Sequence, residues 1–360
     1  MQNIKVLNIV MAKVWGGGEQ YVYDTAFAMQ KRGIKVYVAV DTSNILMQEK
    51  FSEVATVITC DLYSIVGLGS IAKLQTFIRK NNITILNVHS GRAMLLAVAL
   101  KKVTNIVLVV FKHNAVVAKK DFYHKWQRKN VDAYICVSKL VYDLQTIGIE
   151  NINKYHLVYN GINLDKFGLE VECVEKSKCF TIGYAGRIAY DKGIDVLLNA
   201  FALLASKFED VKLLLAGSNE NDYLKEVLVF VKERKLKSKV EYLGHIDDMN
   251  LFYKKLDVFV LPSIVKEAFG LVLCEAMYYG VPVITTDSGA QNEIIDNGID
   301  GFIVEKANAN ALAECVERIY NQSFDIEMIK KNAREKVLRN FDIEHCVNKI
   351  VEVYRDCLKV

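Results

Sequence analysis

The chain has 360 residues, of which 52% are hydrophobic and 24% charged, a composition that excludes a disordered protein. Its length is too great for one ordinary core and suits two domains of about 150 to 200 residues each. Charge is unevenly placed, because residues 1–165 hold 20 Lys and Arg against 11 Asp and Glu, whereas residues 166–360 hold 26 against 31. We therefore expect the first half to meet an anionic partner.

Several features bear on the cellular location. The longest apolar run, AMLLAVAL at 93–100, ends at two lysines and is far short of the ~20 residues that span a bilayer. The opening MQNIKVLNIV lacks the cleavage site of a secretory signal. The eight cysteines include no Cys-x-x-Cys pair and no metal-site spacing. We expect a reduced, cytoplasmic protein without a metal site.

Apolar runs alternate with helical patterns along the first half. The order is a strand at 4–10, a loop with three glycines, a helix at 19–32 and a strand at 34–40. Further strands are predicted at 83–88, 105–111 and 133–138. Near-continuous apolar strands between helices predict a parallel sheet that is covered on both faces.

The second half repeats this plan. A helix is predicted at 193–208, and strands at 180–186, 211–217, 239–245, 257–263 and 281–287. The segment 168–179 shows neither the period of a helix nor the alternation of a strand, so we expect domains at 1–167 and 168–341. The pattern predicts two doubly wound α/β domains facing across a cleft, with ligands at the carboxyl ends of the strands.

The first loop, Trp15-Gly16-Gly17-Gly18-Glu19, precedes a helix. Glycines let a backbone approach a ligand, and a helix N-terminus favours anions. A dinucleotide site is an alternative, since Asp41 ends the next strand, but the spacing is not that of G-x-G-x-x-G. A plain tight turn explains the loop equally well.

The loop GRIAYDKG, at 186–193, lies between a strand and a helix. It carries two cations, Arg187 and Lys192, beside the positive end of that helix. This combination favours a doubly charged anion such as a diphosphate. The alternative is that both are solvated surface charges.

The stretch KEAFGLVLCEAM holds Glu267 and Glu275 at the two ends of an apolar run. We expect a helix that begins near Gly270 and stops at Gly280. Carboxylates accept hydrogen bonds from two hydroxyls at once, so the two acids could hold two different sugars. Solvated helix acids are the alternative. The expected core face of this helix comprises Leu271, Cys274 and Tyr278.

These motifs, together with GVPVITTDSGAQNEII (280–295), VYNGINLDKF (158–167) and GFIV (301–304), resemble those of family 4 glycosyltransferases, which have the GT-B fold. The resemblance covers nearly the whole chain. It implies a retaining transferase that uses a nucleotide-activated sugar as substrate, UDP- or GDP-linked, and needs no metal or other cofactor. A sugar-nucleotide epimerase, a glycogen-type phosphorylase and a non-catalytic nucleotide-sugar-binding subunit remain alternatives.

The resemblance also implies roles by position. Arg187 and Lys192 would hold the donor diphosphate, Glu267 the transferred sugar, and Glu275 the ribose. A covalent nucleophile is the rival role for Glu267. The backbone N–H groups of Phe269, Gly270 and Leu271 would meet the phosphate or sugar, and His245 would contact the base mainly through its backbone. Gly17 and Gly18 would let the first domain close on the diphosphate.

Three further expectations concern the rest of the chain. The loop AGSNEND (216–222) departs from the family, which often has Gly-Asp-Gly or Gly-Glu-Gly there. His89 and His113 each follow a first-half strand; a lone histidine is usually structural, but the resemblance places His113 beside the reacting carbon and matches His89 to a common histidine. A C-terminal helix at about 342–360 is expected to pack on the first domain.

The segment 112–129 holds six Lys and Arg against one Asp, interleaved with aromatic residues. This composition is typical of a surface that docks on anionic lipid. It predicts a peripheral position on the inner face of the membrane and a lipid-linked or oligosaccharide acceptor. A solvated helix face is the alternative, and no nucleic-acid-binding fold accompanies the segment.

Overall fold

The computed structural model describes residues 4–63, 68–166, 178–219, 222–246 and 248–359. The chain divides into two compact units, Met1–Asn163 with Asp342–Val360, and Leu164–Phe341. It therefore leaves the first unit at Asn163 and returns to it at Asp342. The segment 168–179, predicted to separate the domains, lies largely outside the described residues.

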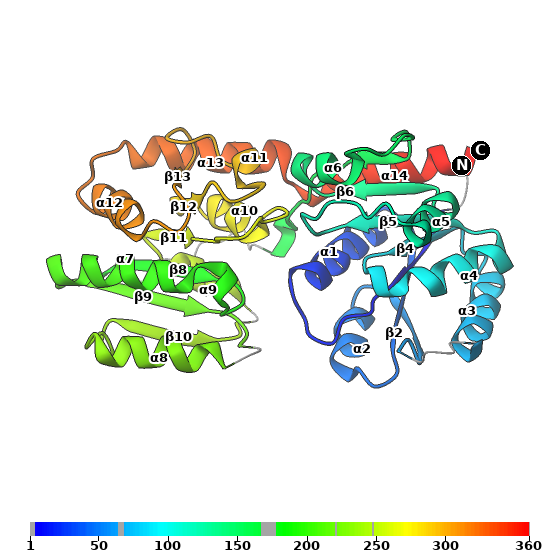
Figure 1. Ribbon diagram of the computed structural model, residues 1–360, viewed down its shortest axis with the longest axis horizontal. Helices are drawn as coiled ribbons and strands as arrows, with labels where there is room; N and C mark the ends of the chain where they lie inside the picture. The colour runs from blue at the N-terminus through cyan, green and yellow to red at the C-terminus, as the bar shows by residue number, and fades with distance from the viewer. Residues whose placement is uncertain (1–3, 64–67, 167–177, 220–221, 247, 360) are drawn as a thin grey trace. The chain divides into compact units, whose positions relative to one another are not determined.

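The described part of the first unit contains a seven-stranded parallel sheet in the order β3-β2-β1-β4-β5-β6-β7 (Figure 1). Its strands are β1 Lys5–Ile9, β2 Lys35–Asp41, β3 Thr56–Cys60, β4 Ile85–Val88, β5 Val107–Lys112, β6 Ala133–Cys136 and β7 Tyr155–Leu157. Its helices are α1 Gly17–Lys31, α2 Ile45–Ser52, α3 Leu68–Asn81, η1 Gly91–Ala93, α4 Met94–Thr104, α5 Phe122–Asn130, α6 Lys139–Thr146 and α14 Ile343–Lys359.

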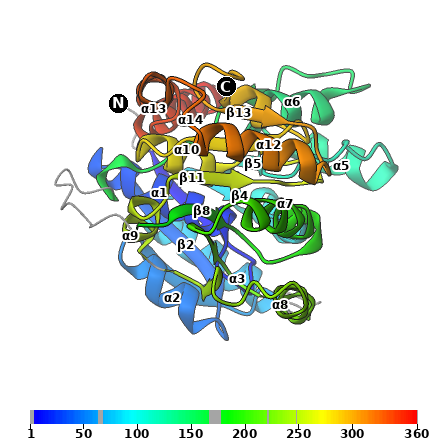
Figure 2. The ribbon, with the colours of Figure 1, turned by 90° about the vertical axis from the view of Figure 1, so that its left-hand side faces the viewer.

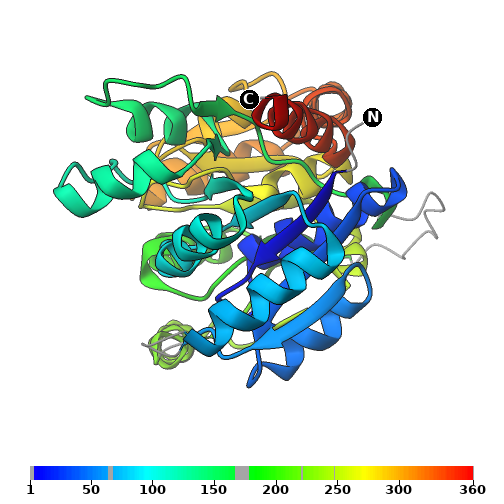
Figure 3. The same cartoon turned by 90° about the vertical axis from the view of Figure 1, so that its right-hand side faces the viewer.

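Helices pack on one another at two places in the first unit. The last helix, α14, dark red in Figure 3, packs against α1, while α4 packs against both α3 and α5. The direction of strand progression reverses between β1 and β4, as in other doubly wound sheets. The carboxyl ends of these two strands therefore flank the point where such sheets bind ligands.

The second unit has the same design, with a six-stranded parallel sheet in the order β10-β9-β8-β11-β12-β13 among its described residues. Its strands are β8 Phe180–Ala185, β9 Val211–Ala216, β10 Val240–Gly244, β11 Val258–Leu261, β12 Val283–Thr286 and β13 Phe302–Val304. Its helices are η2 Leu164–Lys166, η3 Tyr190–Lys192, α7 Ile194–Lys207, α8 Tyr223–Glu233, α9 Met249–Lys254, α10 Leu271–Tyr278, α11 Gln291–Ile294, α12 Ala309–Tyr320 and α13 Ile326–Asn340. Helices α7 and α12 pack side by side (Figure 2).

Helix α1 begins earlier than predicted. Gly16 is its N-cap, and Gly17 and Gly18 form its first turn instead of a loop. The side chain of Glu19 accepts a hydrogen bond from the Gly16 N–H at 3.1 Å, which satisfies an N–H group at the helix start. This cap offsets the low helix propensity of the glycines.

Helix α10 begins and ends as expected, but its predicted core face is partly wrong. Cys274 is buried, whereas Leu271 and Tyr278 are partly exposed. The fully buried residues are Leu273, Cys274, Ala276 and Met277. The helix contacts β11 and β12 as well as α13, so more than one of its sides is covered. A single-face period cannot describe a helix packed in this way.

Three of the described strands, β3, β7 and β13, were not predicted. The sequence of β3, TVITC, mixes two threonines with three apolar residues, and three of its five residues are incompletely buried. Strand β7 is only three residues long. Among the described residues, no helix has both the length and the hydropathy that a membrane span requires.

Candidate active site

In the second unit, the predicted site residues follow two neighbouring strands. Arg187 and Lys192 lie in the loop after β8, and Glu267 lies in the loop after β11. Strands β8 and β11 are adjacent, and strand progression reverses between them. The topology therefore brings these loops to the edge where doubly wound sheets bind ligands.

Lys192, Glu267 and Ser263 form one hydrogen-bonded cluster. The Lys192 ammonium donates to Glu267 Oε1 at 2.5 Å, and the Ser263 hydroxyl donates to the same oxygen at 2.5 Å. Only 19% of the Lys192 side chain and 15% of the Glu267 side chain are exposed, and Ser263 is fully buried. Charge-assisted bonds in such a shielded place hold the carboxylate in one orientation.

Two glycines allow the loops to meet. Gly193 has φ +70°, and a Cβ there would lie 2.1 Å from the Pro262 carbonyl oxygen. A Cβ on Gly289 would lie 2.5 Å from both the backbone N and the backbone O of Glu267. No side chain fits at either position. The backbone of Glu267 is further fixed by its carbonyl, which accepts a hydrogen bond from the Ala290 N–H at 3.0 Å.

Arg187 lies in the same loop as Lys192 but has a different partner. Its guanidinium donates to Asp191 at 2.9 Å, and both side chains are substantially exposed. The buried Tyr184 hydroxyl donates to the Arg187 carbonyl at 2.8 Å. Burial raises the Tyr184 pKa, and the nearby Glu267 carboxylate raises it further. Tyr184 thus fixes the backbone of Arg187, whereas the guanidinium of Arg187 pairs with Asp191.

Glu275 is held by another element. The fully buried Tyr253, in α9, donates from its hydroxyl to Glu275 Oε2 at 2.7 Å. Burial, followed by the charge of Glu275, raises the pKa of Tyr253 well above its ordinary value. The hydroxyl is therefore a fixed donor. The two glutamates of KEAFGLVLCEAM are held by separate groups and do not form a pair.

The other second-unit positions are backbone sites or lie further out. Phe269 is buried, Gly270 is the N-cap of α10 with φ +122°, and Leu271 starts that helix. The first N–H groups of a helix have no hydrogen-bond partner within the helix, so the start of α10 offers donors to a ligand. His245 is exposed just beyond β10. The Ser218 carbonyl accepts a bond from the Ile188 N–H at 2.9 Å, which ties the divergent loop AGSNEND to GRIAYDKG.

In the first unit, the two glycines in the first turn of α1 have open surroundings. A Cβ on Gly17 or on Gly18 would meet no atom within 4 Å, and neither glycine has a positive φ. The fold itself therefore does not require glycine at these positions. This is the arrangement expected where glycines serve close approach by a ligand.

His89 and His113 are in direct contact. His89 Nδ1 lies 3.0 Å from His113 Nε2, and His89 Nε2 lies 3.1 Å from Asn8 Oδ1. Phe111 stacks on His89 with ring centroids 4.5 Å apart. Burial lowers the pKa of His113 to about 4 and that of His89 well below its ordinary value. Both rings are neutral at pH 7.

Asp41 follows a different pattern from that of a ribose-binding acid. Its carboxylate accepts hydrogen bonds from the N–H and the hydroxyl of Ser43 and from the Leu62 N–H, at 2.5 to 2.9 Å. Together these bonds lower its pKa although burial opposes them. Both carboxylate oxygens of Asp41 therefore accept hydrogen bonds from the loops that follow β2 and β3, and they order these loops. Because these oxygens already have partners, the contacts do not favour the dinucleotide interpretation.

The predicted residues are thus divided between the units. Gly17, Gly18, His89 and His113 lie in the first, and the other eight lie in the second. Sequence reasoning missed the side chains that hydrogen-bond to these residues, namely Ser263, Tyr253 and Asn8. In the described part of the chain, no three His, Cys, Asp or Glu side chains are grouped so as to hold a metal ion.

Known protein families match both halves. The model of glycosyl transferases group 1 matches residues 172–336, and that of glycosyltransferase family 4 matches residues 15–166. One relative is the capsular polysaccharide biosynthesis glycosyltransferase CapM of Staphylococcus aureus, 36% identical over 213 residues. That match covers 56% of this chain and 54% of CapM, so the chain spans about half the length of this relative.

Solved structures extend the likeness to the whole chain. A glycosyltransferase from Rickettsia africae is similar over 100% of both chains, with a TM-score of 0.87 and 25% identity. Anabaena HepE, solved in complex with UDP and glucose, is similar over 98% of this chain and 100% of its own, with a TM-score of 0.86 and 19% identity. With family matches in both halves and this fold throughout, the chain is a member of glycosyltransferase family 4 with the GT-B fold.

Proposed function

We propose that this protein is a retaining hexosyltransferase that uses a UDP- or GDP-linked sugar and needs no metal ion. The observation that carries the proposal is the contact between Lys192 and Glu267 at the strand reversal of the second unit. A cation for phosphate and an acceptor for sugar hydroxyls lie side by side there. The complex of Anabaena HepE with UDP and glucose supports the choice of donor.

Cleavage of a glycosyl–phosphate bond places negative charge on the leaving diphosphate. The Lys192 ammonium has three N–H groups, so it can hold Glu267 and a phosphate oxygen together. Arg187 is held by an exposed pair with Asp191, which stabilises its position by less than about 1 kcal/mol and leaves it able to turn toward phosphate. Fixed cations on the leaving group supply electrostatic stabilisation without a metal.

Glu267 then acts as a sugar-binding group. Two donors already bind its Oε1, which reduces the electron density that a covalent nucleophile needs. The acceptor hydroxyl attacks from the face that the phosphate leaves, and a phosphate oxygen takes its proton. Retention of configuration follows from this same-face geometry. His113 and His89 belong to the acceptor side of the reaction.

The central test separates turnover from binding. Arg187→Ala should lower kcat by about 10² to 10³-fold while donor Kd changes by less than about tenfold. Acceptor-free release of nucleoside diphosphate and calorimetric titration of the donor measure the two quantities. Lys207→Ala, which removes another exposed ion pair of the same unit, is the matched control and should change neither. Equal losses in kcat and in donor affinity would contradict the proposal.

The donor is identified first by a thermal-shift screen of UDP, GDP, ADP and their sugars. A ligand at 100 times its Kd adds about 2.7 kcal/mol to stability, which is readily seen. Isomerisation of the sugar would indicate an epimerase, and binding without turnover would indicate a non-catalytic subunit. Either outcome would replace the transferase proposal.

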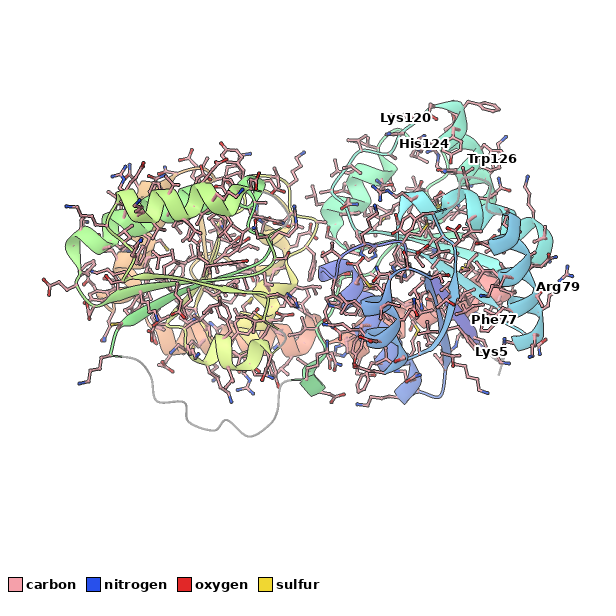
Figure 4. The ribbon with its side chains drawn as sticks, turned by 90° about the horizontal axis from the view of Figure 1, so that it is seen from below. Lys5, Phe77, Arg79, Lys120, His124 and Trp126 are labelled. Atoms are coloured by element: carbon pink, nitrogen blue, oxygen red, sulfur yellow. The ribbon has the colours of Figure 1, made fainter. Side chains whose placement is uncertain are left out.

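The acceptor is proposed to be a lipid-linked sugar or an oligosaccharide of a surface polysaccharide. The name of the S. aureus relative supports a polysaccharide product. In the first unit, Phe122 is 87% exposed, and Val116 and Val117 are also exposed. Figure 4 shows Lys120, His124 and Trp126 gathered around α5. Lys112, counted in the basic segment, is largely buried instead, and burial lowers its pKa.

We propose that this surface binds anionic lipid through four exposed lysines and Phe122. Each lysine contributes about 1 kcal/mol near an anionic membrane. Sedimentation with phosphatidylglycerol vesicles should show binding that falls with salt and with replacement of the lysines by serine. A second-unit cluster with the same charge is the control. Binding that ignores salt, or that both clusters support equally, would contradict this surface. The tested lysines are Lys119, Lys120, Lys125 and Lys129, and the control residues are Lys232, Arg234, Lys235 and Lys237.

A further inference from the structure

Two asparagines lie side by side in the apolar centre of the first-unit sheet. Asn8 in β1 and Asn87 in β4 are register partners, and only 4% and 2% of them are exposed. Burying an amide costs free energy unless it is hydrogen-bonded. Asn87 Nδ2 donates to Asn8 Oδ1 at 3.1 Å, so the pair satisfies itself in part.

The pair belongs to a longer chain of hydrogen bonds. Side chains two residues apart share one face of a strand, so His89 lies on the same face as Asn87. His89 Nε2 reaches Asn8 Oδ1, and His89 Nδ1 reaches His113 Nε2. At the other end, Asn87 Nδ2 donates to the Tyr354 hydroxyl of α14 at 2.6 Å. We call these five residues the asparagine–histidine relay.

Within the relay, the position of one hydrogen fixes the position of the next. Asn8 Oδ1 can only accept, so His89 Nε2 must carry a hydrogen and donate to it. In a neutral His89, Nδ1 then holds a lone pair and accepts from His113 Nε2–H. In a neutral His113, the remaining nitrogen, Nδ1, is therefore the one with the lone pair.

The reverse direction is less favourable. In the direction just given, both N–H groups of Asn87 are used, and only its Oδ1 lacks a partner among the described residues. Turning both amides would reverse every donor and leave the Asn87 NH₂ group unpaired instead. Buried N–H groups without a partner are rarer than under-satisfied carbonyl oxygens. The surrounding rings of Phe111 and Tyr21 add no competing charge.

We propose that Asn8, Asn87 and Tyr354 are positioning residues that, through His89, hold His113 in its Nε2–H tautomer. The Nδ1 lone pair of His113 is then the atom offered to a substrate hydroxyl. His113 accordingly serves as a hydrogen-bond acceptor and does not act as a cation. This inference rests on the proposed function, because it assigns His113 to the reacting substrates.

The test reads the tautomer directly in the ligand-free, full-length protein. Long-range ¹H–¹⁵N NMR of ¹⁵N-histidine-labelled protein at pH 7 distinguishes the tautomers, and His113→Gln assigns the resonance. We expect wild-type His113 to be protonated at Nε2 alone. Asn8→Leu should give a mixture of tautomers, and Tyr354→Phe, which removes only a hydroxyl, a smaller change. Tyr21→Phe is the matched control, since its buried hydroxyl contacts Cys346 outside the relay, and it should change nothing.

Activity supplies the second measurement. Asn8→Leu should lower kcat by about 10 to 100-fold with donor KM unchanged, less than the loss on removing His113 itself. A wild-type His113 protonated at Nδ1, or a tautomer unaffected by both relay variants, overturns the inference. A changed tautomer with unchanged kcat also overturns the positioning role. Absence of turnover with every nucleotide sugar would refute the proposed function and leave the NMR result standing. Should Asn8→Leu fail to fold, Tyr354→Phe carries the test.

Discussion

Replacing Gly193 by alanine should damage the second unit far more than the same change at Gly280. Both glycines have a left-handed backbone, with φ +70° and +69°, so alanine costs about 1 kcal/mol at each for conformation alone. At Gly280 a Cβ meets no atom within 4 Å. At Gly193 it lies 2.1 Å from the Pro262 carbonyl oxygen, so the loop must move by about 1 Å, which adds about 2 kcal/mol. The expected losses of unfolding free energy are about 3 and about 1 kcal/mol.

Urea unfolding followed by circular dichroism measures both variants. Tryptophan fluorescence is less suitable, because Trp15 and Trp126 lie in the first unit. Since Gly193 adjoins Lys192, Gly193→Ala should also weaken donor binding, whereas Gly280→Ala should not. Equal stability losses in the two variants would refute the argument that the β8 and β11 loops are in backbone contact. A large loss of unfolding free energy in Gly193→Ala with unchanged donor affinity would show that the loop contact does not affect donor binding.

Three further predictions concern ionisable groups. Burial holds the pKa of His113 in the folded protein at about 4, below its ordinary 6.5, so the unfolded chain binds the proton first as pH falls. The free energy of unfolding should therefore drop by up to about 3 kcal/mol between pH 6.5 and 4. Urea unfolding of His113→Gln should show a weaker dependence of this free energy on pH. For Lys192→Met and Glu267→Gln, a double-mutant cycle in unfolding free energy should give a coupling of about 1 to 3 kcal/mol, and additive effects would contradict a direct contact. Tyr253→Phe should cost about 1 to 2 kcal/mol and weaken donor binding severalfold in a calorimetric titration through Glu275; a normal donor affinity would count against that role.

The fold follows from the sequence because parallel strands covered on both faces leave a strong signal. Runs such as NIVLVVF and VKLLLAG are apolar on both faces, and strands form at both. The signal fails where an element is short or only half covered, as in β7 and β3. It also fails at the start of α1, where Glu19 caps the helix and lets two glycines enter its first turn.

The site was predictable only as far as loops after strands. Sequence order places Arg187 and Lys192 after β8 and Glu267 after β11, but the adjacency of these strands comes from the sheet order. The Lys192–Glu267 contact joins residues 75 positions apart, which no local pattern reveals. In the relay, Asn8 and Asn87 did leave a trace, since each is polar within an apolar strand. Tyr354 left none, because its partner lies 267 positions away.

The two glutamates that end the apolar stretch illustrate how a local pattern acquires meaning from the fold. Glu267 precedes α10 and is held by groups from the loops after β8 and β11, whereas Glu275 lies in the second turn and is held by α9. A helix rises ~1.5 Å per residue, so Glu275 lies ~7 Å along the axis beyond Gly270. The run between them is apolar because α10 must pack on the sheet and on α13, and this packing is what keeps the two carboxylates apart and fixed. The spacing of the acids therefore depends on α10, which carries Glu275 and begins shortly after Glu267. Two donors from the loops after β8 and β11 hold Glu267, and one donor from α9 holds Glu275.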